Sequence, residues 1–153
     1  MTRTAAREIA ILLGFSAAHG GETAEETMER FFDEEHYASL AEENELFAEY
    51  PDAQQMAYIR TLVELIAAHR GELDAYIEKY ARGWKTERIS RTAGAILRCA
   101  MSEILWMPEV PNAAAINEAV ELAKKYEDAD VVSFINGILG GFVRGELEQK
   151  EEE

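Results

Sequence analysis

Hydrophobic residues recur at intervals of three and four along most of the chain, which is the spacing of one face of an α-helix. The clearest stretch is residues 115–126, AINEAVELAKKY, in which one apolar stripe is formed by Ile116, Ala119, Val120 and Ala123. No segment shows the alternation with period two that is typical of a half-buried strand. The pattern therefore predicts an all-α protein.

Turn and capping residues divide this pattern into about seven helices. The expected helices span approximately residues 4–18, 23–35, 51–70, 71–83, 90–107, 112–126 and 130–144. An N-cap side chain accepts a hydrogen bond from a free backbone N–H of the first helical turn. The N-caps that we predict are Thr23, Ser90, Asn112 and Asp130. The acidic stretch 36–50 is expected to hold a further short helix and a loop.

The length and composition suit one compact domain that ends in an acidic, frayed tail over 146–153. The apolar runs are far shorter than the roughly 18–20 residues of a membrane span. Glu8 interrupts the N-terminal apolar stretch, so we expect no signal peptide. The single cysteine, Cys99, cannot form an internal disulfide, and it lies on an apolar stripe. We expect a cytoplasmic protein that does not bind membranes.

The formal charge of −15 is distributed unevenly along the chain. Residues 22–50 hold eleven Asp and Glu and a single Arg, whereas residues 79–98 hold six Lys and Arg and a single Glu. The cations of this basic island are Lys79, Arg82, Lys85, Arg88, Arg91 and Arg98. Local charge acts within a Debye length of about 8 Å, so the island would attract phosphates. The alternative is a solvated loop and helix end.

Residue constellations typical of catalysis or metal binding are not found in the sequence. His19, His36 and His69 are scattered, and no serine or cysteine has a paired base nearby in the sequence. Asp33 and His36 have the spacing of half a di-metal motif, but such a site needs a second copy and two further glutamates. No Gly-rich phosphate loop follows a strand. We therefore expect neither an enzyme nor a cofactor or metal site.

Five motifs follow one another in the second half of the chain. They are a turn at Trp84, AILR at 95–98, VP at 110–111, INEAVELAKKY at 116–126 and FINGIL at 134–139. In this order and spacing they resemble the C-terminal half of the NusB family of transcription antitermination factors. The N-terminal AREIAILLGF, residues 6–15, is similar to the first helix of that family.

This resemblance implies a fold and a function. The fold is two packed helical bundles in one domain, over about residues 1–70 and 71–145. NusB-like proteins bind the boxA segment of ribosomal RNA transcripts together with NusE, a small-subunit ribosomal protein, and help RNA polymerase to read through terminators. The expected partners are therefore boxA-type RNA, NusE and the RNA polymerase antitermination complex, with a homodimer as a further assembly.

The resemblance also implies which residues bind RNA, where arginines hold phosphates and aromatic rings stack on unpaired bases. The family positions are matched by Arg3, Arg7, Tyr80, Arg98, Asp130 and Phe134. Phe15 stands where the family often has tyrosine, so it keeps the ring but loses the hydroxyl donor. The remaining cations of the basic island complete the predicted RNA-binding set: Lys79, Arg82, Lys85, Arg88 and Arg91. Phe134 also lies on the apolar stripe of Ile138, which favours a core position for its ring.

The chain departs from the family where charged residues are usual. The N-terminal arginine cluster is thinned to Arg3 and Arg7, and the charged positions elsewhere are replaced by Ala93-Gly94, Ser133 and Gly140-Gly141. Each lost cation predicts weaker and less salt-dependent RNA binding.

Two asparagines, Asn117 and Asn136, each follow an isoleucine at the edge of an apolar stripe. We interpret both as helix-packing polar ties whose amides satisfy a backbone group at a neighbouring helix end, since an unpaired buried group costs about 1–3 kcal/mol. Gly137 would let a neighbouring helix approach closely.

Three functional hypotheses follow from the sequence. The first is an RNA-binding antitermination factor that acts with NusE on boxA. The alternative is a protein-interaction module of the same fold with weak or lost RNA binding. The third, an RNA methyltransferase, would need a downstream α/β cofactor domain beyond Glu153. The first two differ in whether the basic island shares a face with Arg3 and Arg7.

Overall fold

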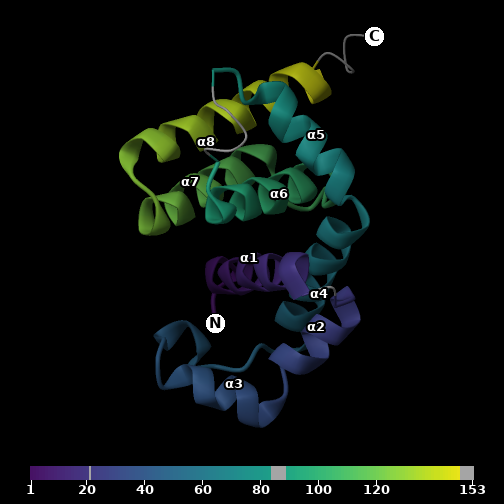
Figure 1. Ribbon diagram of the computed structural model, residues 1–153, viewed down its shortest axis with the longest axis vertical. Helices are drawn as coiled ribbons and strands as arrows, with labels where there is room; N and C mark the ends of the chain where they lie inside the picture. Colours follow the sequence, from purple (N-terminus) through teal and green to yellow (C-terminus); the bar gives the residue numbers. More distant parts are fainter. Residues whose placement is uncertain (21, 84–88, 149–153) are drawn as a thin grey trace. The chain divides into compact units, whose positions relative to one another are not determined.

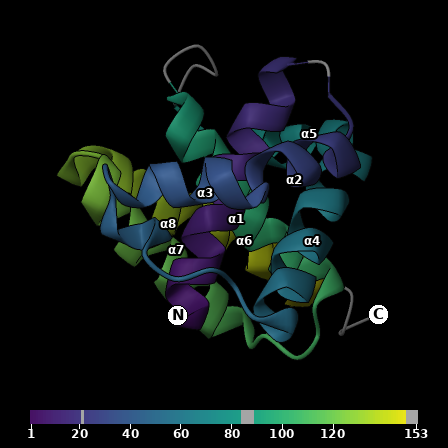
Figure 2. The ribbon, with the colours of Figure 1, turned by 90° about the horizontal axis from the view of Figure 1, so that it is seen from below.

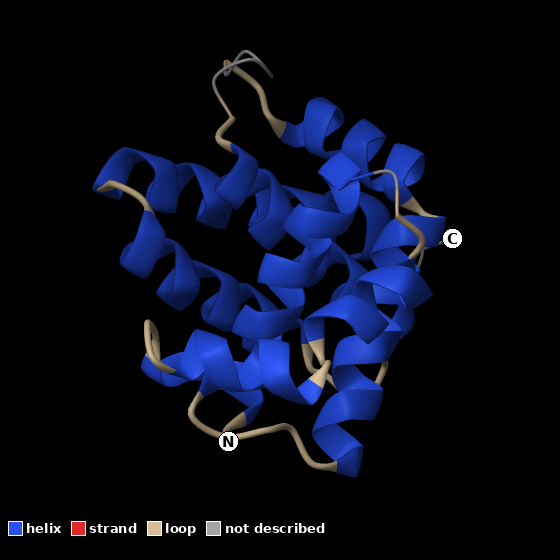
Figure 3. Cartoon of the chain, turned by 60° about the horizontal axis from the view of Figure 1, so that its bottom comes forward, coloured by secondary structure: helices blue, strands red, loops and turns tan. Residues whose placement is uncertain are grey.

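The structure is a computed structural model that describes residues 1–20, 22–83 and 89–148, and the side chains of residues 15–20 lie outside this description. Eight α-helices and two short helical segments make up the regular structure of the described residues, which contain no strand (Figure 3). The all-α prediction is therefore confirmed. The chain divides into two compact units, Met1–Ala68 and His69–Glu153.

The first unit is built on two helices that lie side by side, α1 (Arg3–Gly20) and α4 (Ala53–Ala68) (Figure 1). Helix α2 (Ala24–Phe31) contacts both of them. Helix α3 (Glu34–Ala41) contacts α2 and the 3-10 segment η1 (Glu45–Phe47) (Figure 2). The predicted short helix and loop in the acidic stretch are thus α3 and η1.

The single helix predicted over 23–35 is wrong, because two helices form there. Thr23 caps α2 as predicted, since its hydroxyl accepts from the Glu26 N–H at 3.1 Å. The Asp33 carboxylate accepts from the His36 N–H at 3.1 Å and so starts α3. A strong N-cap inside a continuous helical pattern therefore breaks the helix in two.

A cluster of aromatic rings joins α2, α3 and η1, with ring centroids of neighbouring rings 5.0–6.0 Å apart. Its members are Phe31, Phe32, Tyr37, Phe47 and Tyr50. The Tyr37 side chain lies at its centre and is 3% exposed, and its hydroxyl donates to the Glu49 carbonyl at 2.7 Å. Burial, with smaller contributions from Tyr50 and Glu49, raises the pKa of Tyr37 to about 12.

The second unit is arranged around α6 (Arg91–Trp106), which contacts α5 (Arg70–Tyr80), α7 (Asn112–Tyr126) and α8 (Ala129–Phe142). Eleven residues of α6 are buried. Helix α8 continues into a π-helical segment, η3 (Val143–Glu148), beside the end of α5 (Figure 1).

Two of the predicted N-caps in the second unit are wrong. Ser90 caps α6 as predicted, with its hydroxyl accepting from the Ala93 N–H at 3.0 Å. Asn112 is the first residue of α7 rather than its cap, which is Pro111. Asp128, not Asp130, caps α8 by accepting from the Val131 N–H at 3.1 Å. Two aspartates spaced by two are equally good caps by residue type, and the start of the helix selects the first.

The C-terminal helix is also longer than predicted. The tail from residue 146 is predicted to fray, but η3 is helical through Glu148 and the Glu146 carboxylate lies 3.1 Å from Lys79 Nζ. This hydrogen bond raises the pKa of Lys79. Residues 149–153 lie outside the described part of the chain.

Candidate nucleic-acid interface

The N-terminal arginines meet over one aromatic ring of the first unit. The guanidinium carbons of Arg3 and Arg7 lie 4.1 and 5.6 Å from the centre of the Tyr58 ring, so both make cation–π contacts with α4. Arg3 is exposed, whereas Arg7 is 5% exposed. Of these two arginines, therefore, only Arg3 is exposed to solvent. The burial of Arg7 does not suit direct contact with RNA. The side chain of Phe15 lies outside the described residues.

The basic island lies in the second unit, and the structure describes four of its six cations: Lys79, Arg82, Arg91 and Arg98. Lys79 is paired with Glu146, and Arg98 is paired with Asp74. Arg82 and Arg91 are exposed and have no ion pair within the described residues. Lys85 and Arg88 lie outside that part of the chain. Half of the described island is thus neutralised by the protein's own carboxylates.

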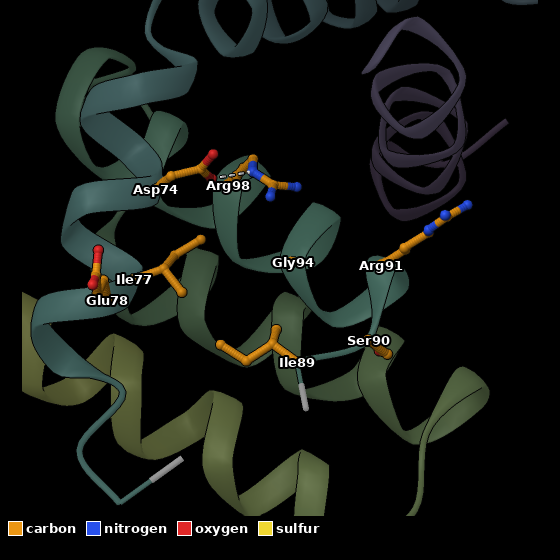
Figure 4. A pocket seen from close by; sticks show the side chains of 8 residues that line it. All are labelled: Asp74, Ile77, Glu78, Ile89, Ser90, Arg91, Gly94 and Arg98. Atoms are coloured by element: carbon orange, nitrogen blue, oxygen red, sulfur yellow. Dashed lines mark hydrogen bonds and ion pairs between the residues drawn. The ribbon is translucent and has the colours of Figure 1, made fainter. Parts of the chain in front are cut away.

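A cavity of about 300 Å³ is lined by residues of α5, of the first turns of α6 and of the segment before α6 (Figure 4). Its lining residues are Asp74, Ile77, Glu78, Ile89, Ser90, Arg91, Gly94 and Arg98. Figure 4 shows the Asp74 and Arg98 side chains facing each other, while Arg91 points away from this pair. Two carboxylates and two guanidinium groups therefore share one cavity.

The Arg98 side chain is held in place from two sides. Its Nε donates to Asp74 Oδ1 at 2.7 Å, and the other Asp74 oxygen lies 3.4 Å from Arg70 Nε. A Cβ at Gly94 would lie 3.2 Å from an Arg98 guanidinium nitrogen, so the absent side chain of Gly94 lets Arg98 lie back along α6. Arg98 remains 18% exposed in its side chain. The guanidinium of Arg98 is therefore paired with a carboxylate and still partly accessible to solvent.

Three further predicted residues lie in the second unit. Tyr80 is partly exposed, with its ring centre 5.4 Å from Lys79 Nζ and 6.1 Å from the Phe142 ring. Asp130 is exposed in the first turn of α8. Phe134 is 8% exposed, as its apolar stripe favours. The ring of Phe134 is a core side chain rather than an open stacking surface.

The predicted packing role of Asn117 and Asn136 is wrong, because both side chains are exposed. The buried faces of α7 and α8 contain neighbours such as Ala119 and Ile138 instead. A Cβ built at Gly137 meets no heavy atom within 4 Å, so no helix approaches there. The edge of an apolar stripe is equally the edge of the solvent face, and both asparagines take the solvent side.

The sequence reasoning missed one cationic residue, Arg144. A cavity of about 380 Å³ in the second unit is lined by Tyr80, Arg82, Gly137, Gly141, Arg144 and Gly145. The signal that would have found it is the spacing of four between Gly137, Gly141 and Gly145, which clears one face of α8 and η3. Arg144 directly precedes Gly145, the last of these three glycines.

The first unit has a cavity of the opposite character. It has a volume of about 570 Å³ and is lined by Glu22, Glu26, Glu29, Arg30, Asp33 and His36. A hydrogen bond to Glu22 raises the pKa of Arg30. Across the residues that the structure describes, no three His, Cys, Asp or Glu side chains are grouped so that they could hold a metal ion. Among all the described residues of both units, no helix has the length and apolar character that a membrane span needs.

Comparison with known proteins gives one family throughout. Residues 4–144 match the NusB family. The transcription antitermination protein NusB of Clostridium botulinum (strain Kyoto / Type A2) is 32% identical over 143 residues, which covers 94% of this chain and 100% of that protein. The transcription antitermination protein NusB of Natranaerobius thermophilus is 36% identical over 141 residues, covering 91% and 92% of the two chains.

Solved structures have the same fold. T. maritima NusB matches with a TM-score of 0.71 at 25% identity, over 100% of this chain and 99% of that one. A chain in the crystal structure of a plectonemic RNA supercoil matches with a TM-score of 0.72 at 24% identity, over 94% and 96% of the two chains, which is a likeness of fold alone. The family match over residues 4–144 and the relatives that share a third of their residues along nearly their whole length show that this chain belongs to the NusB family.

Proposed function

We propose that this protein is an RNA-binding transcription antitermination factor. The relatives described above are named transcription antitermination proteins. The observation that supports RNA binding most directly is the pair of exposed arginines, Arg82 and Arg91, without ion pairs in the described residues of an acidic protein. A phosphate would supply the anionic partner that neither guanidinium group has among the described residues. Arginine binds phosphate through a planar fork of donors.

The proposed target is a boxA-type segment of ribosomal RNA transcripts, bound together with NusE in the RNA polymerase antitermination complex. The proposed location is the cytoplasm, and the proposed role is binding without catalysis. Single-stranded RNA offers a phosphate at every nucleotide and unstacked bases between them. Arg91 at the start of α6 would bind one phosphate, and the partly exposed ring of Tyr80 is the aromatic surface available to a base.

Arg98 would bind RNA by exchange of partners. In the free protein its guanidinium is paired with Asp74, and a phosphate that enters the cavity would compete with this carboxylate for the same donors. The Asp74 side chain is 45% exposed, so water can solvate its carboxylate when a phosphate takes its place at Arg98. Asp74 would therefore act as an internal competitor of the RNA.

This competition predicts opposite effects of two substitutions on RNA affinity. Arg98→Gln should weaken RNA binding by about tenfold, because one charged donor to phosphate is lost. Asp74→Asn should strengthen it by about threefold, because the guanidinium is released and a negative charge is removed. Fluorescence anisotropy with a labelled boxA-like RNA measures both. Equal affinity of both variants and the wild type would mean that the ion pair is purely structural.

The alternative function is a protein-interaction module with weak RNA binding. The specific observations that favour it are the internal pairing of Lys79 and Arg98 and the burial of Arg7. One titration distinguishes the two functions: labelled boxA-like RNA against the protein, with and without NusE, from low to physiological salt. Binding that exceeds binding to a scrambled RNA and falls steeply with salt supports the antitermination factor. Binding of NusE without any binding of RNA supports the alternative.

A further inference from the structure

One cavity of the second unit is lined by three glycines, Gly137, Gly141 and Gly145, which have no side chains to fill it. Tyr80, the last residue of α5, lies across Gly141 and Gly145 of the neighbouring α8 and η3. A Cβ at Gly141 would lie 3.4 Å from the ring, and a Cβ at Gly145 would overlap the hydroxyl. One turn earlier, Gly137 has open space where a side chain would be. The ring therefore occupies the space beside Gly141 and Gly145, whereas Gly137 is exposed.

The charge of this cavity differs from that of the other two. Its lining contains two guanidinium groups, Arg82 and Arg144, and no carboxylate. Both arginines are exposed, and neither has an ion pair within residues 1–20, 22–83 and 89–148. The carboxylate nearest in sequence, Glu146, is already paired with Lys79. In a protein with a net charge of −15, this cavity concentrates unneutralised positive charge.

The two arginines belong to different segments, and this makes the cavity suitable for one anion between them. Arg82 follows the end of α5, and Arg144 lies in η3. The Arg144 guanidinium lies back along the helix, 3.2 Å from a Cβ built at Gly140. A phosphodiester has two free oxygens and can accept from two guanidinium groups at once. A volume of about 380 Å³ leaves room for the attached ribose as well as the phosphate.

We propose that this cavity is a phosphate subsite of the RNA-binding surface, in which Arg82 and Arg144 hold one backbone phosphate of the bound strand. The subsite rests on the proposed function, because the RNA is its ligand. It extends the predicted RNA-binding residues to η3, whose last three residues, 146–148, belong to the tail that the sequence predicts to fray. A phosphate contact of this kind adds affinity and salt dependence without reading the base sequence.

The test uses a pair of substitutions that differ only in charge, Gly137→Glu and Gly137→Gln. The open space at Gly137 accommodates either side chain, and both replace glycine with a better helix former, so folding is expected to be retained. The glutamate would place a negative charge in the cavity. We expect Gly137→Glu to bind labelled boxA-like RNA about tenfold more weakly than Gly137→Gln, because one phosphate contact is lost. For Gly137→Glu, the slope of log K against the logarithm of the salt concentration should also become shallower, by about 0.7.

A second pair separates the cavity from net charge. Arg144→Gln removes a cation of the cavity, and Arg60→Gln removes an exposed arginine of α4 in the first unit. A salt slope lowered in Arg144→Gln but not in Arg60→Gln supports the subsite. Equal slopes in the two variants, or equal affinity of the two Gly137 variants, would overturn it while RNA binding by the wild type stands. A wild type that binds no RNA at low salt would overturn the proposed function, and the subsite with it.

Discussion

Phe142→Ala should lower the free energy of unfolding of the second unit by about 3–5 kcal/mol. Phe142 is 0% exposed at the end of α8, and its ring centre lies 5.0 Å from that of Tyr76 and 6.1 Å from that of Tyr80. Truncation removes the transfer free energy of the ring and leaves a cavity between α5 and α8. Edge-to-face contacts with the two tyrosines are lost in addition.

Urea unfolding followed by circular dichroism measures this loss. Tyr126→Ala is the matched control, because it removes an aromatic ring of the same unit that is 39% exposed, and it should change the free energy of unfolding by less than about 1 kcal/mol. A loss below about 1 kcal/mol in Phe142→Ala would mean that α5 and α8 are not packed through this ring. Because Tyr80 rests against the same ring, the variant should also weaken RNA binding.

The first unit should lose about 2–3 kcal/mol of stability between pH 10 and pH 12 through Tyr37 alone. Burial raises the pKa of Tyr37 from 10.0 to about 12, so the folded state keeps the phenol proton where the unfolded state releases it. Because folding raises the pKa of this acid, the contribution of Tyr37 to the free energy of unfolding is complete below pH 10. It is lost as pH rises through the folded value, because the buried hydroxyl must then ionise among aromatic rings.

Tyr37→Phe isolates this contribution from other alkaline titrations. At pH 7 the variant should be about 1 kcal/mol less stable, because the hydrogen bond from the Tyr37 hydroxyl to the Glu49 carbonyl is lost. Between pH 10 and pH 12 its stability should fall less than that of the wild type. The measurement is a set of urea unfolding curves at fixed pH. Parallel pH dependence in both proteins would show that the Tyr37 phenol is accessible to water.

Most of the fold is predictable from local sequence signals. The apolar stripes locate α4, α6, α7 and α8, because a helix in a small protein must bury one face. Thr23 and Ser90 cap helices as their residue types indicate. The errors arise where two local signals compete. Asp33 caps a helix inside a continuous helical pattern, and Asp128 competes with Asp130 for one cap.

The candidate site is less predictable, because charge pairing depends on tertiary structure. The sequence identifies Arg98 as a cation, but only the packing of α5 against α6 brings Asp74 within 2.7 Å of it. The position of η3 beside the end of α5 likewise pairs Lys79 with Glu146 across 67 positions of sequence. Asn117 and Asn136 show the converse limit. An asparagine beside an apolar stripe can face the core or the solvent, and both asparagines face the solvent.

The measurement that tests RNA binding by the second unit most directly is an NMR titration of the arginine side chains. In a ¹⁵N-labelled protein, each Nε–H reports on the anion that its guanidinium contacts. Saturation with boxA-like RNA should shift the signals of Arg82, Arg91, Arg98 and Arg144 and leave that of Arg60 unchanged. Saturation with RNA that shifts none of these four signals would contradict the proposed interface.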